Sequence, residues 1–148
     1  MTWQRNGFTI DTNKDQLDLN YIHEFLSTQS YWAEQIPFDI VRRSVEGSRC
    51  FGVYRNEKQV GFARLISDAA TFAYLADVFI DASHRGQGLG KWLMEVILGH
   101  PDVQDVRGIM LGTKDAHSLY QKFGFTAIDD RFMRLHFPNR YKQQQPAK

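Results

Sequence analysis

The chain has 148 residues, which fits one domain with a sizeable hydrophobic core. Its hydrophobic content is 43%, and 18 basic against 17 acidic residues leave a net charge of +1. A charge so near neutrality gives no electrostatic reason to expect nucleic acid or a membrane as a partner, and no apolar run reaches the roughly 18 residues of a membrane span. The N-terminal residues lack the apolar core of a signal peptide, and the single cysteine, Cys50, cannot form an internal disulfide. We therefore expect a cytoplasmic protein.

Hydrophobic periodicity predicts alternating strands and helices, with no internal repeat and no second domain. The expected strands are residues 7–11, 49–54, 59–66, 72–80, 106–111, 125–128 and 132–137. The expected helices are residues 15–27 or 18–27, 38–46, 88–98 and 116–122. Asp15 or Asp18 can cap the first helix, and Gly124 ends the last one. Residues 1–138 are expected to form the domain, and the polar tail 139–148 is expected to be disordered.

Residues 85–90 read Arg-Gly-Gln-Gly-Leu-Gly and join the apolar strand 72–80 to an amphipathic helix. The first N–H groups of a helix lack intrahelical partners and carry partial positive charge, so such a turn suits a phosphate. Glycines let the main chain approach the anion closely, and Arg85 adds a fixed charge. A turn that starts a helix without any ligand is the plain structural alternative.

Two common phosphate-binding motifs do not fit the spacing of this turn. A P-loop needs a glycine where Arg85 stands and a hydroxyl where Trp92 stands. Gly86, Gly88 and Gly90 give G-x-G-x-G, whereas a dinucleotide fingerprint needs G-x-G-x-x-G in the first strand–helix turn. The sequence therefore disfavours nucleoside triphosphates and NAD.

The spacing Arg85-x-x-Gly88-x-Gly90 resembles the coenzyme A loop of the GNAT superfamily of N-acetyltransferases. A second segment, Leu-Tyr-Gln-Lys-Phe-Gly-Phe at residues 119–125, is similar to another signature of that family. The resemblance covers roughly residues 50–137. It implies an α/β (α+β) GNAT fold with a mixed, mostly antiparallel central sheet that is splayed between its fourth and fifth strands, and helices on both faces. Dimers are common for this fold, so a homodimer is left open.

The resemblance implies an enzyme that transfers an acetyl group from acetyl-CoA, its co-substrate, directly to a primary amine. It places the pantetheine arm along the strand before the turn and the pyrophosphate in the turn. The implied cofactor contacts are Val78, Phe79, Ile80, Arg85, Gly86, Gln87, Gly88, Leu89, Gly90, Lys91, Thr113 and Ser118. Many family members have Asn where this chain has Thr113, which weakens the contact expected there.

Two side chains are candidates for proton transfer. By resemblance, Tyr120 protonates the departing CoA thiolate, and a phenol that is protonated at neutral pH can donate. Asp77 is a lone carboxylate in an apolar strand, and burial there would suit it to accept a proton or to order a water. The alternatives are a tyrosine that packs its ring while its hydroxyl meets water, and an aspartate that lies on the solvent face or bonds to neighbouring backbone.

The acceptor is the least defined part of the site. Tyr31 and Trp32 lie between the first two helices and could wall the acceptor pocket, and Glu34 could pair with an amine. The same residues could instead pack the two helices together. A small molecule or a peptide could supply the amine.

The five histidines have no metal-binding spacing, so we expect no metal. Two rival functions stay open at this point: a non-catalytic acyl-CoA-binding module, and an interaction module whose glycine turn is only structural. Binding of acetyl-CoA without turnover would favour the first, and absence of binding the second.

Overall fold

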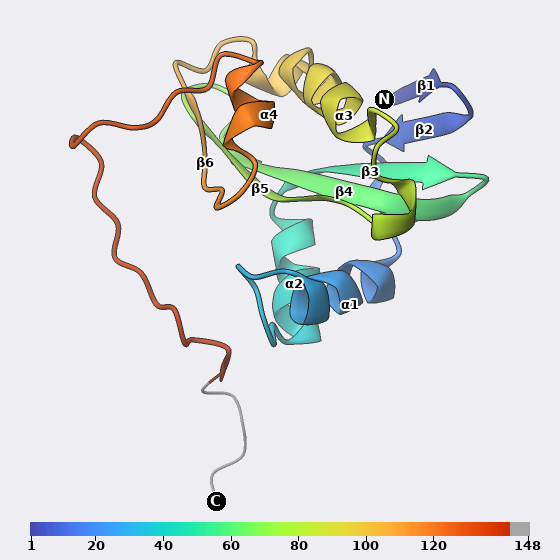
Figure 1. The fold of residues 1–148 in the computed structure, drawn as a ribbon, viewed down its shortest axis with the longest axis horizontal. Helices are drawn as coiled ribbons and strands as arrows, with labels where there is room; N and C mark the ends of the chain where they lie inside the picture. Colours follow the sequence, from blue (N-terminus) through green and yellow to red (C-terminus); the bar gives the residue numbers. More distant parts are fainter. Residues whose placement is uncertain (143–148) are drawn as a thin grey trace, which may run out of the picture.

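The computed structural model describes residues 1–142 and places helices on both faces of a six-stranded sheet (Figure 1). The strands are β1 (Thr2–Arg5), β2 (Phe8–Asp11), β3 (Arg49–Arg55), β4 (Lys58–Ser67), β5 (Ala73–Ile80) and β6 (Ile109–Leu111). The helices are α1 (Leu19–Gln29), α2 (Phe38–Glu46), α3 (Leu89–Leu98) and α4 (His117–Gln121). Short 3₁₀ turns lie at Lys14–Gln16, Ala82–His84 and Pro101–Val103. Of the tail expected at residues 139–148, residues 143–148 lie outside the described part.

The sheet follows chain order from β1 to β6, and only the last pair of strands is parallel. Ala73–Leu75 of β5 pair with Ile109–Leu111 of β6, and the pairing ends there. The C-terminal half of β5, residues 76–80, therefore has β4 on one side and no strand on the other among the described residues. This is the expected splay, since the fourth and fifth predicted strands correspond to β5 and β6. It opens the sheet directly before the glycine turn.

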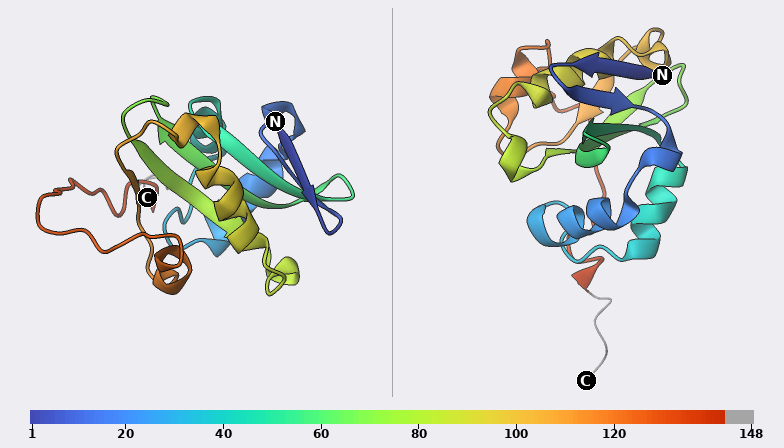
Figure 2. Two further views of the ribbon diagram at one scale, coloured as in Figure 1. Left: turned by 90° about the horizontal axis from the view of Figure 1, so that it is seen from above. Right: turned by 90° about the vertical axis from the view of Figure 1, so that its right-hand side faces the viewer.

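Two hydrophobic cores lie on opposite faces of the sheet, with α1 and α2 on one side and α3 on the other (Figure 2). Successive strand residues point to opposite faces, so Cys50 packs beneath α1 and α2 while Phe51 packs beneath α3. Phe62 and Leu93 are fully buried, one in each core. Each such side chain stabilises the fold by about 1.5–3 kcal/mol.

Local sequence signals predicted where several helices begin or end. Asp18 caps α1, because its Oδ1 accepts a hydrogen bond of 3.0 Å from the Tyr21 amide, whereas Asp15 belongs to the preceding 3₁₀ turn. Gly47 ends α2, and Gly124 follows α4 with a φ of +93°. Within the described residues, no helix has the length and apolar character needed to cross a bilayer.

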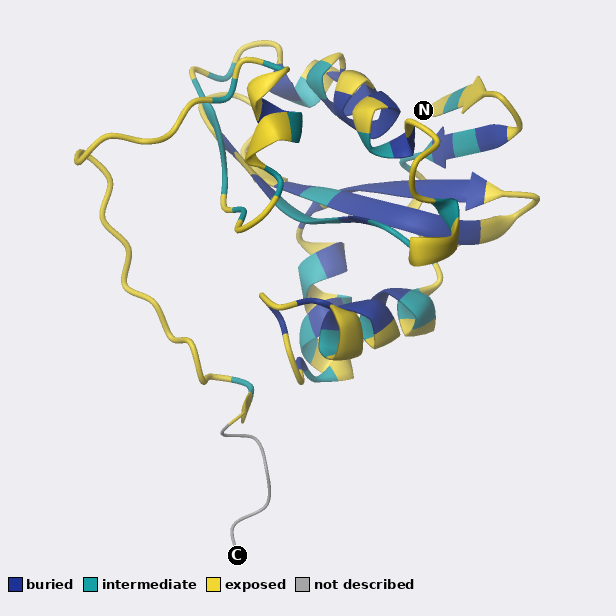
Figure 3. Cartoon of the chain, viewed as in Figure 1, coloured by how far each residue is buried: buried dark blue, intermediate teal, exposed yellow. Residues whose placement is uncertain are grey.

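The predicted strands at residues 125–128 and 132–137 were wrong, because neither segment forms a strand. The alternating pattern of residues 132–137 favours an extended chain, but a strand also requires a partner edge. Here residues 129–140, which we call the arm, run away from the sheet (Figure 1) and are exposed throughout (Figure 3).

Strand β1 was missed, since Trp3 is its only large apolar residue. It forms through a tight hairpin at Asn6-Gly7, where both residues have positive φ. The Asn-Gly pair is the strongest short-range hairpin signal and could have predicted this strand.

Candidate functional site

The glycine turn has the backbone shape that its sequence predicts. Gly86 and Gly88 both have φ of +80°, and Gly88 caps the N-terminus of α3 in the left-handed region. Other residues would be strained there by about 1–2 kcal/mol. No atom lies within 4 Å of the positions where a Cβ would stand, so the turn presents open main chain to a ligand.

Side chains around the turn hold it against the end of β5. Arg85 Nε donates to the Ile80 carbonyl oxygen at 3.0 Å, which places a guanidinium at the mouth of the turn. His84 Nδ1 lies 2.7 Å from Asp81 Oδ1, and the Tyr21 hydroxyl donates to Asp81 Oδ2 at 3.3 Å. The turn is thereby linked to α1 as well as to β5.

Strand β5 carries a bulge between its two halves. Phe79 pairs with Phe62 and Ala76 pairs with Arg64, so Asp77 and Val78 stand opposite Ala63 alone. Asp77 has φ of +54°, a conformation rare for a residue with a side chain. The bulge interrupts the β4–β5 hydrogen-bond ladder where the sheet splays. It also changes the direction of the main-chain groups of Asp77 and Val78.

A cavity of about 530 Å³, which we call the turn cleft, runs from this half of β5 to the glycine turn. Its lining residues are Phe25, Gln29, Tyr31, Trp32, Val78, Phe79, Ile80, His84, Arg85, Gly86, Gly88, Leu89, Gly90, Asp115, Ala116, Leu119 and Tyr120. Unpaired strand backbone stands at one end, and a helix N-terminus with an arginine at the other. The cleft therefore suits an elongated ligand that has an amide-containing arm and a phosphate group.

Asp77 is held from both sides by side-chain donors. Arg64 Nε donates to Asp77 Oδ2 at 2.6 Å, and Trp32 Nε1 donates to Asp77 Oδ1 at 2.9 Å. Arg64 also donates through Nη1 to Ser48 Oγ at 3.0 Å. The Asp77 side chain is only 9% exposed. The carboxylate is thus fixed in position, although it is not the isolated group that the sequence predicted.

A second cavity of about 440 Å³, the Trp32 pocket, adjoins the turn cleft. Tyr31, Trp32 and Tyr120 line both cavities, and the carboxylate of Asp77 lies in the wall of the second. The rings of Tyr31 and Trp32 meet edge to face at 4.9 Å, and the Tyr31 hydroxyl accepts a hydrogen bond of 2.7 Å from the Lys114 amide. Both aromatic residues therefore line a cavity that adjoins the turn cleft.

Tyr120 projects from α4 to the place where the cavities meet. It is 8% exposed, and its ring packs edge to face on Phe125 with centroids 5.8 Å apart. Burial, with smaller contributions from Tyr31 and Asp115, raises the pKa of Tyr120 to about 12. Its hydroxyl is therefore protonated throughout the neutral range and is available as a proton donor.

Other predicted site residues lie away from the turn cleft. Thr113 Oγ1 accepts from the Ala116 amide at 3.1 Å, and Thr113 lines the Trp32 pocket instead. Ser118, Gln87 and Lys91 are exposed and do not line the cleft. Glu34 lies 3.8 Å from Lys142 Nζ and does not line the Trp32 pocket.

Sequence reasoning missed Arg64, Arg134 and His136, all of which line the Trp32 pocket. Arg64 had a signal, since it is a lone cation within the apolar run of β4. No sequence signal pointed to Arg134 and His136, because they line the pocket only through the course that the arm takes in the structure. Residues 1–142 contain no group of three or more His, Cys, Asp or Glu side chains placed to hold a metal ion.

The splayed sheet, the bulged strand and the glycine turn define an acyl-CoA-dependent acyltransferase class, and comparison with known proteins agrees. The profile of the Acetyltransferase (GNAT) domain matches residues 46–127. A protein of Gibberella zeae, named as a candidate acetyltransferase, is 31% identical over 143 residues, which cover 81% of this chain and 79% of that protein. This chain belongs to the GNAT family of acetyltransferases.

Solved structures give the same result. A GNAT-family protein of Xanthomonas campestris pv. campestris superposes with a TM-score of 0.88 at 43% identity, over 90% of this chain and 96% of that one. A candidate acetyltransferase of Clostridium acetobutylicum, solved with acetyl-CoA, has the same fold at a TM-score of 0.67 and 13% identity, over 87% of this chain and 96% of that one. The chain is therefore an acetyl-CoA-dependent N-acetyltransferase.

Proposed function

We propose that this enzyme transfers the acetyl group directly to a primary amine in the Trp32 pocket, with Tyr120 as the general acid. One observation carries the proposal: Tyr120 lines both the turn cleft and the Trp32 pocket. A group at that junction stands where an acyl donor in one cavity would meet an acceptor in the other. Acetyl-CoA supplies the activated thioester, and the residues of the chain supply position and protons.

In this proposal acetyl-CoA lies along the turn cleft. The N–H groups of the glycine turn and the guanidinium of Arg85 would hold the pyrophosphate. The free edge of Val78–Ile80 would pair with the pantetheine arm as an added strand does. A main-chain N–H at the bulge would donate to the thioester oxygen, because the bulge withdraws it from the β4 ladder.

The proposed reaction accounts for each bond and each proton. The amine nitrogen attacks the thioester carbon, the C–N bond forms and the C–S bond breaks, and the departing thiolate takes the proton of the Tyr120 hydroxyl. The proton lost by the amine passes to Asp77, directly or through a water. Exchange with solvent returns both side chains to their starting states.

Tyr31 and Trp32 form the wall on which the acceptor would rest. Their faces suit an alkyl chain or a cationic group, which agrees with an amine acceptor. Glu34 is engaged with Lys142 outside the pocket, so the proposal does not use it.

Calorimetric titration with acetyl-CoA, with NADH and GTP as controls, tests the cleft. We expect selective micromolar binding of acetyl-CoA, followed by release of free CoA thiol with members of a panel of primary amines. Failure to bind acetyl-CoA would contradict the assignment of the cleft. Release of thiol at an unchanged rate by Tyr120→Phe would contradict the role of the phenol.

A further inference from the structure

His84 lies in the wall of the turn cleft, directly before Arg85, and the proposed reaction does not use it. Its side chain is 21% exposed, so protein covers most of the ring. The 3₁₀ turn Ala82–His84 brings the ring back over the residue that precedes the turn, since the His84 amide donates to the Asp81 carbonyl oxygen at 3.1 Å. Local backbone therefore places an imidazole at the mouth of the glycine turn.

One ring nitrogen of His84 is already engaged. Nδ1 lies 2.7 Å from Asp81 Oδ1 and 3.0 Å from Ser83 Oγ. An ionised carboxylate accepts hydrogen bonds and has no hydrogen to donate, which assigns the hydrogen of the neutral ring to Nδ1. The Ser83 hydroxyl donates to Asp81 Oδ1 at 2.9 Å, so its oxygen can accept from Nδ1 as well. Nε2 has no hydrogen-bond partner among the described residues and is the nitrogen that a ligand can reach.

Contacts from two further elements hold the Asp81–His84 pair in place. The Tyr21 hydroxyl, from α1, donates to Asp81 Oδ2 at 3.3 Å. Phe8, from β2, meets the His84 ring edge to face with centroids 6.1 Å apart. Burial opposes the charge of Asp81, but the hydrogen bonds that His84 and Ser83 donate to it lower its pKa overall. An ionised carboxylate therefore faces Nδ1, and negative charge there favours the protonated form of an imidazole.

The charged groups around the ring favour an anion at Nε2. Asp81 is the ion-pair partner of His84 among the described residues, and its charge faces Nδ1. Arg85 carries the adjacent positive charge in the cleft wall, and the guanidinium of Arg55 stacks at 5.0 Å on the aromatic ring that packs against His84. Asp115 is the one acid among the described residues that line the cleft, and it forms no ion pair with His84.

We propose that Nε2 of His84 binds a diphosphate oxygen of acetyl-CoA as a protonated imidazole, so that the enzyme takes up one proton from solvent when it binds its co-substrate. A neutral ring would present a lone pair at Nε2 to a negatively charged oxygen, whereas protonation makes Nε2 a charged donor. His84 then adds a titratable charge beside the fixed charge of Arg85. The His84 contact rests on the proposed position of acetyl-CoA in the turn cleft, and not on the roles proposed for Tyr120 and Asp77.

Calorimetric titration in two buffers of different ionisation enthalpy measures the number of protons taken up on binding. The ligands are acetyl-CoA and acetyl-dephospho-CoA, because the second keeps the diphosphate but lacks the 3′-phosphate, which itself titrates near neutral pH. We expect uptake approaching one proton at pH 8 with both ligands. The affinity should fall by up to about tenfold per pH unit above the ordinary imidazole value of about 6.5, since the bound form carries the extra proton.

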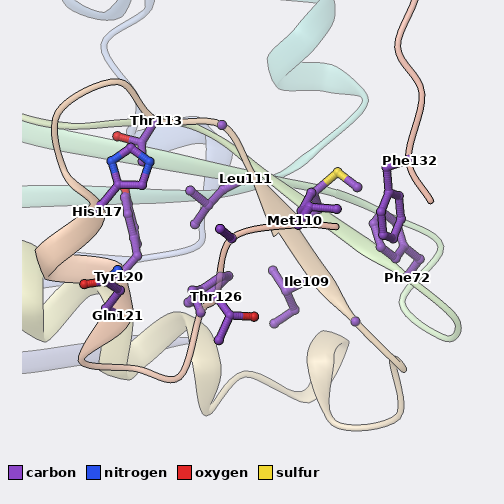
Figure 4. Close-up of a pocket in the computed structure, with 15 residues that line it drawn as sticks. Phe72, Ile109, Met110, Leu111, Thr113, His117, Tyr120, Gln121, Thr126 and Phe132 are labelled. Carbon is purple, nitrogen blue, oxygen red and sulfur yellow. The ribbon is translucent and has the colours of Figure 1, made fainter. Parts of the chain in front are cut away.

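Two substitutions of His84 separate its charge from its hydrogen bonds. His84→Asn removes Nε2 and can keep the bond to Asp81, because its amide nitrogen takes the place of Nδ1. His84→Gln instead places an uncharged amide donor near the position of Nε2. Both variants should lose the proton uptake, and His84→Gln should retain more of the affinity. His117→Asn is the matched control, since His117 is exposed on α4 and lines a separate cavity of about 450 Å³ (Figure 4) rather than the turn cleft.

Circular dichroism shows whether each variant is folded, and the control should keep the proton uptake of the wild-type protein. Equal uptake in the wild-type protein and both His84 variants, or wild-type binding without uptake, would overturn the role of His84 and leave the acetyl-CoA site in place. A difference in uptake that appears only with acetyl-CoA would overturn the diphosphate contact, because it would depend on the 3′-phosphate. A wild-type protein that binds neither ligand would contradict the proposed cleft itself, and the His84 contact with it.

Discussion

Arg64 and Asp77 form a largely buried ion pair that joins β4 to the bulge of β5, with Nε and Oδ2 2.6 Å apart. The strand ladder is interrupted at this point, so the side chains make the connection that the backbone does not. Trp32 adds a third partner and attaches the loop between α1 and α2 to the same carboxylate. The shape of the β5 end of the turn cleft and the wall of the Trp32 pocket therefore depend on one aspartate.

Removing one partner of this ion pair should lower the stability of the fold. We expect Arg64→Leu to lower the free energy of unfolding by about 3–5 kcal/mol, because it leaves a buried, unpaired carboxylate. Arg64→Leu/Asp77→Leu should be more stable than Arg64→Leu, since no uncompensated charge remains. Urea unfolding of the two variants measures the difference. A double variant that is less stable than Arg64→Leu would show that the pair is not the source of the loss.

Asp77→Asn tests proton transfer, with urea unfolding to show that the variant is folded under the assay conditions, because it also removes the charge that pairs with Arg64. The amide has nearly the same shape, but it has one acceptor oxygen, so it can accept a hydrogen bond from only one of the two donors Trp32 and Arg64. It cannot take up the proton of the amine. We expect a lower kcat and little change in the Kd for acetyl-CoA. Trp32→Phe removes one hydrogen bond to Asp77 and should lower kcat less than Asp77→Asn does. A kcat that is unchanged in Asp77→Asn would exclude the carboxylate as the proton acceptor.

Tyr120→Phe should lower kcat by about tenfold or more and leave the Kd for acetyl-CoA nearly unchanged. The ring still packs on Phe125, so only the proton donor is lost. Because the pKa of Tyr120 is raised to about 12, the wild-type rate should not fall through loss of this proton below pH 10. The measurement is a pH series of steady-state rates with binding followed by calorimetry. A drop in affinity as large as the drop in kcat would indicate a binding role instead.

Gly90→Ala should separate stability from cofactor binding. A Cβ at Gly90 would lie 3.9 Å from Leu119 Cδ2, which is ordinary contact, and alanine is better than glycine in a helix by about 0.5–1 kcal/mol. We expect an unchanged or higher Tm with weaker binding of acetyl-CoA, since the methyl group enters the turn cleft. Gly99→Ala, at the C-cap residue that follows α3, is the control for a Gly→Ala change away from the turn cleft. Equal affinity for acetyl-CoA in Gly90→Ala would argue against close approach of the pyrophosphate.

Stability should fall as the pH rises above 10. Burial is the first cause that raises the pKa values of Tyr21, Tyr54 and Tyr120, so the folded protein keeps phenolic protons that the unfolded chain loses. Their contribution is complete below the unfolded value of about 10 and is lost as the pH rises through the folded values. Urea unfolding between pH 8 and pH 11 measures the slope.

Tyr54 offers a direct control for this dependence. Its hydroxyl is buried and has no hydrogen-bond partner among the described residues. Tyr54→Phe removes an unsatisfied polar group, so we expect stability at pH 8 to stay level or rise by about 1 kcal/mol, and the slope above pH 10 to become smaller. A large loss of stability at pH 8 would show that the hydroxyl is satisfied in solution.

The sequence by itself determined the features that depend on neighbouring residues. Periodicity predicted α3 and β5, and glycine spacing predicted the turn between them. Side-chain chemistry limited the cap of α1 to Asp15 or Asp18, and the structure has it at Asp18. The motif around Tyr120 indicated the family, and the fold agrees with it. These predictions hold because helix caps, turns and amphipathic faces are set within a few residues of chain.

Only the tertiary structure decided which distant residues meet. It paired Asp77 with Arg64 and Trp32 and placed Tyr120 between two cavities. It also placed Thr113 outside the turn cleft and Glu34 outside the Trp32 pocket. In the structure, residues 132–137 also lie outside the sheet, although their alternation of apolar and polar side chains is typical of a strand. A strand exists only when another edge satisfies its backbone, and the position of that edge is a property of the whole fold that no local pattern contains.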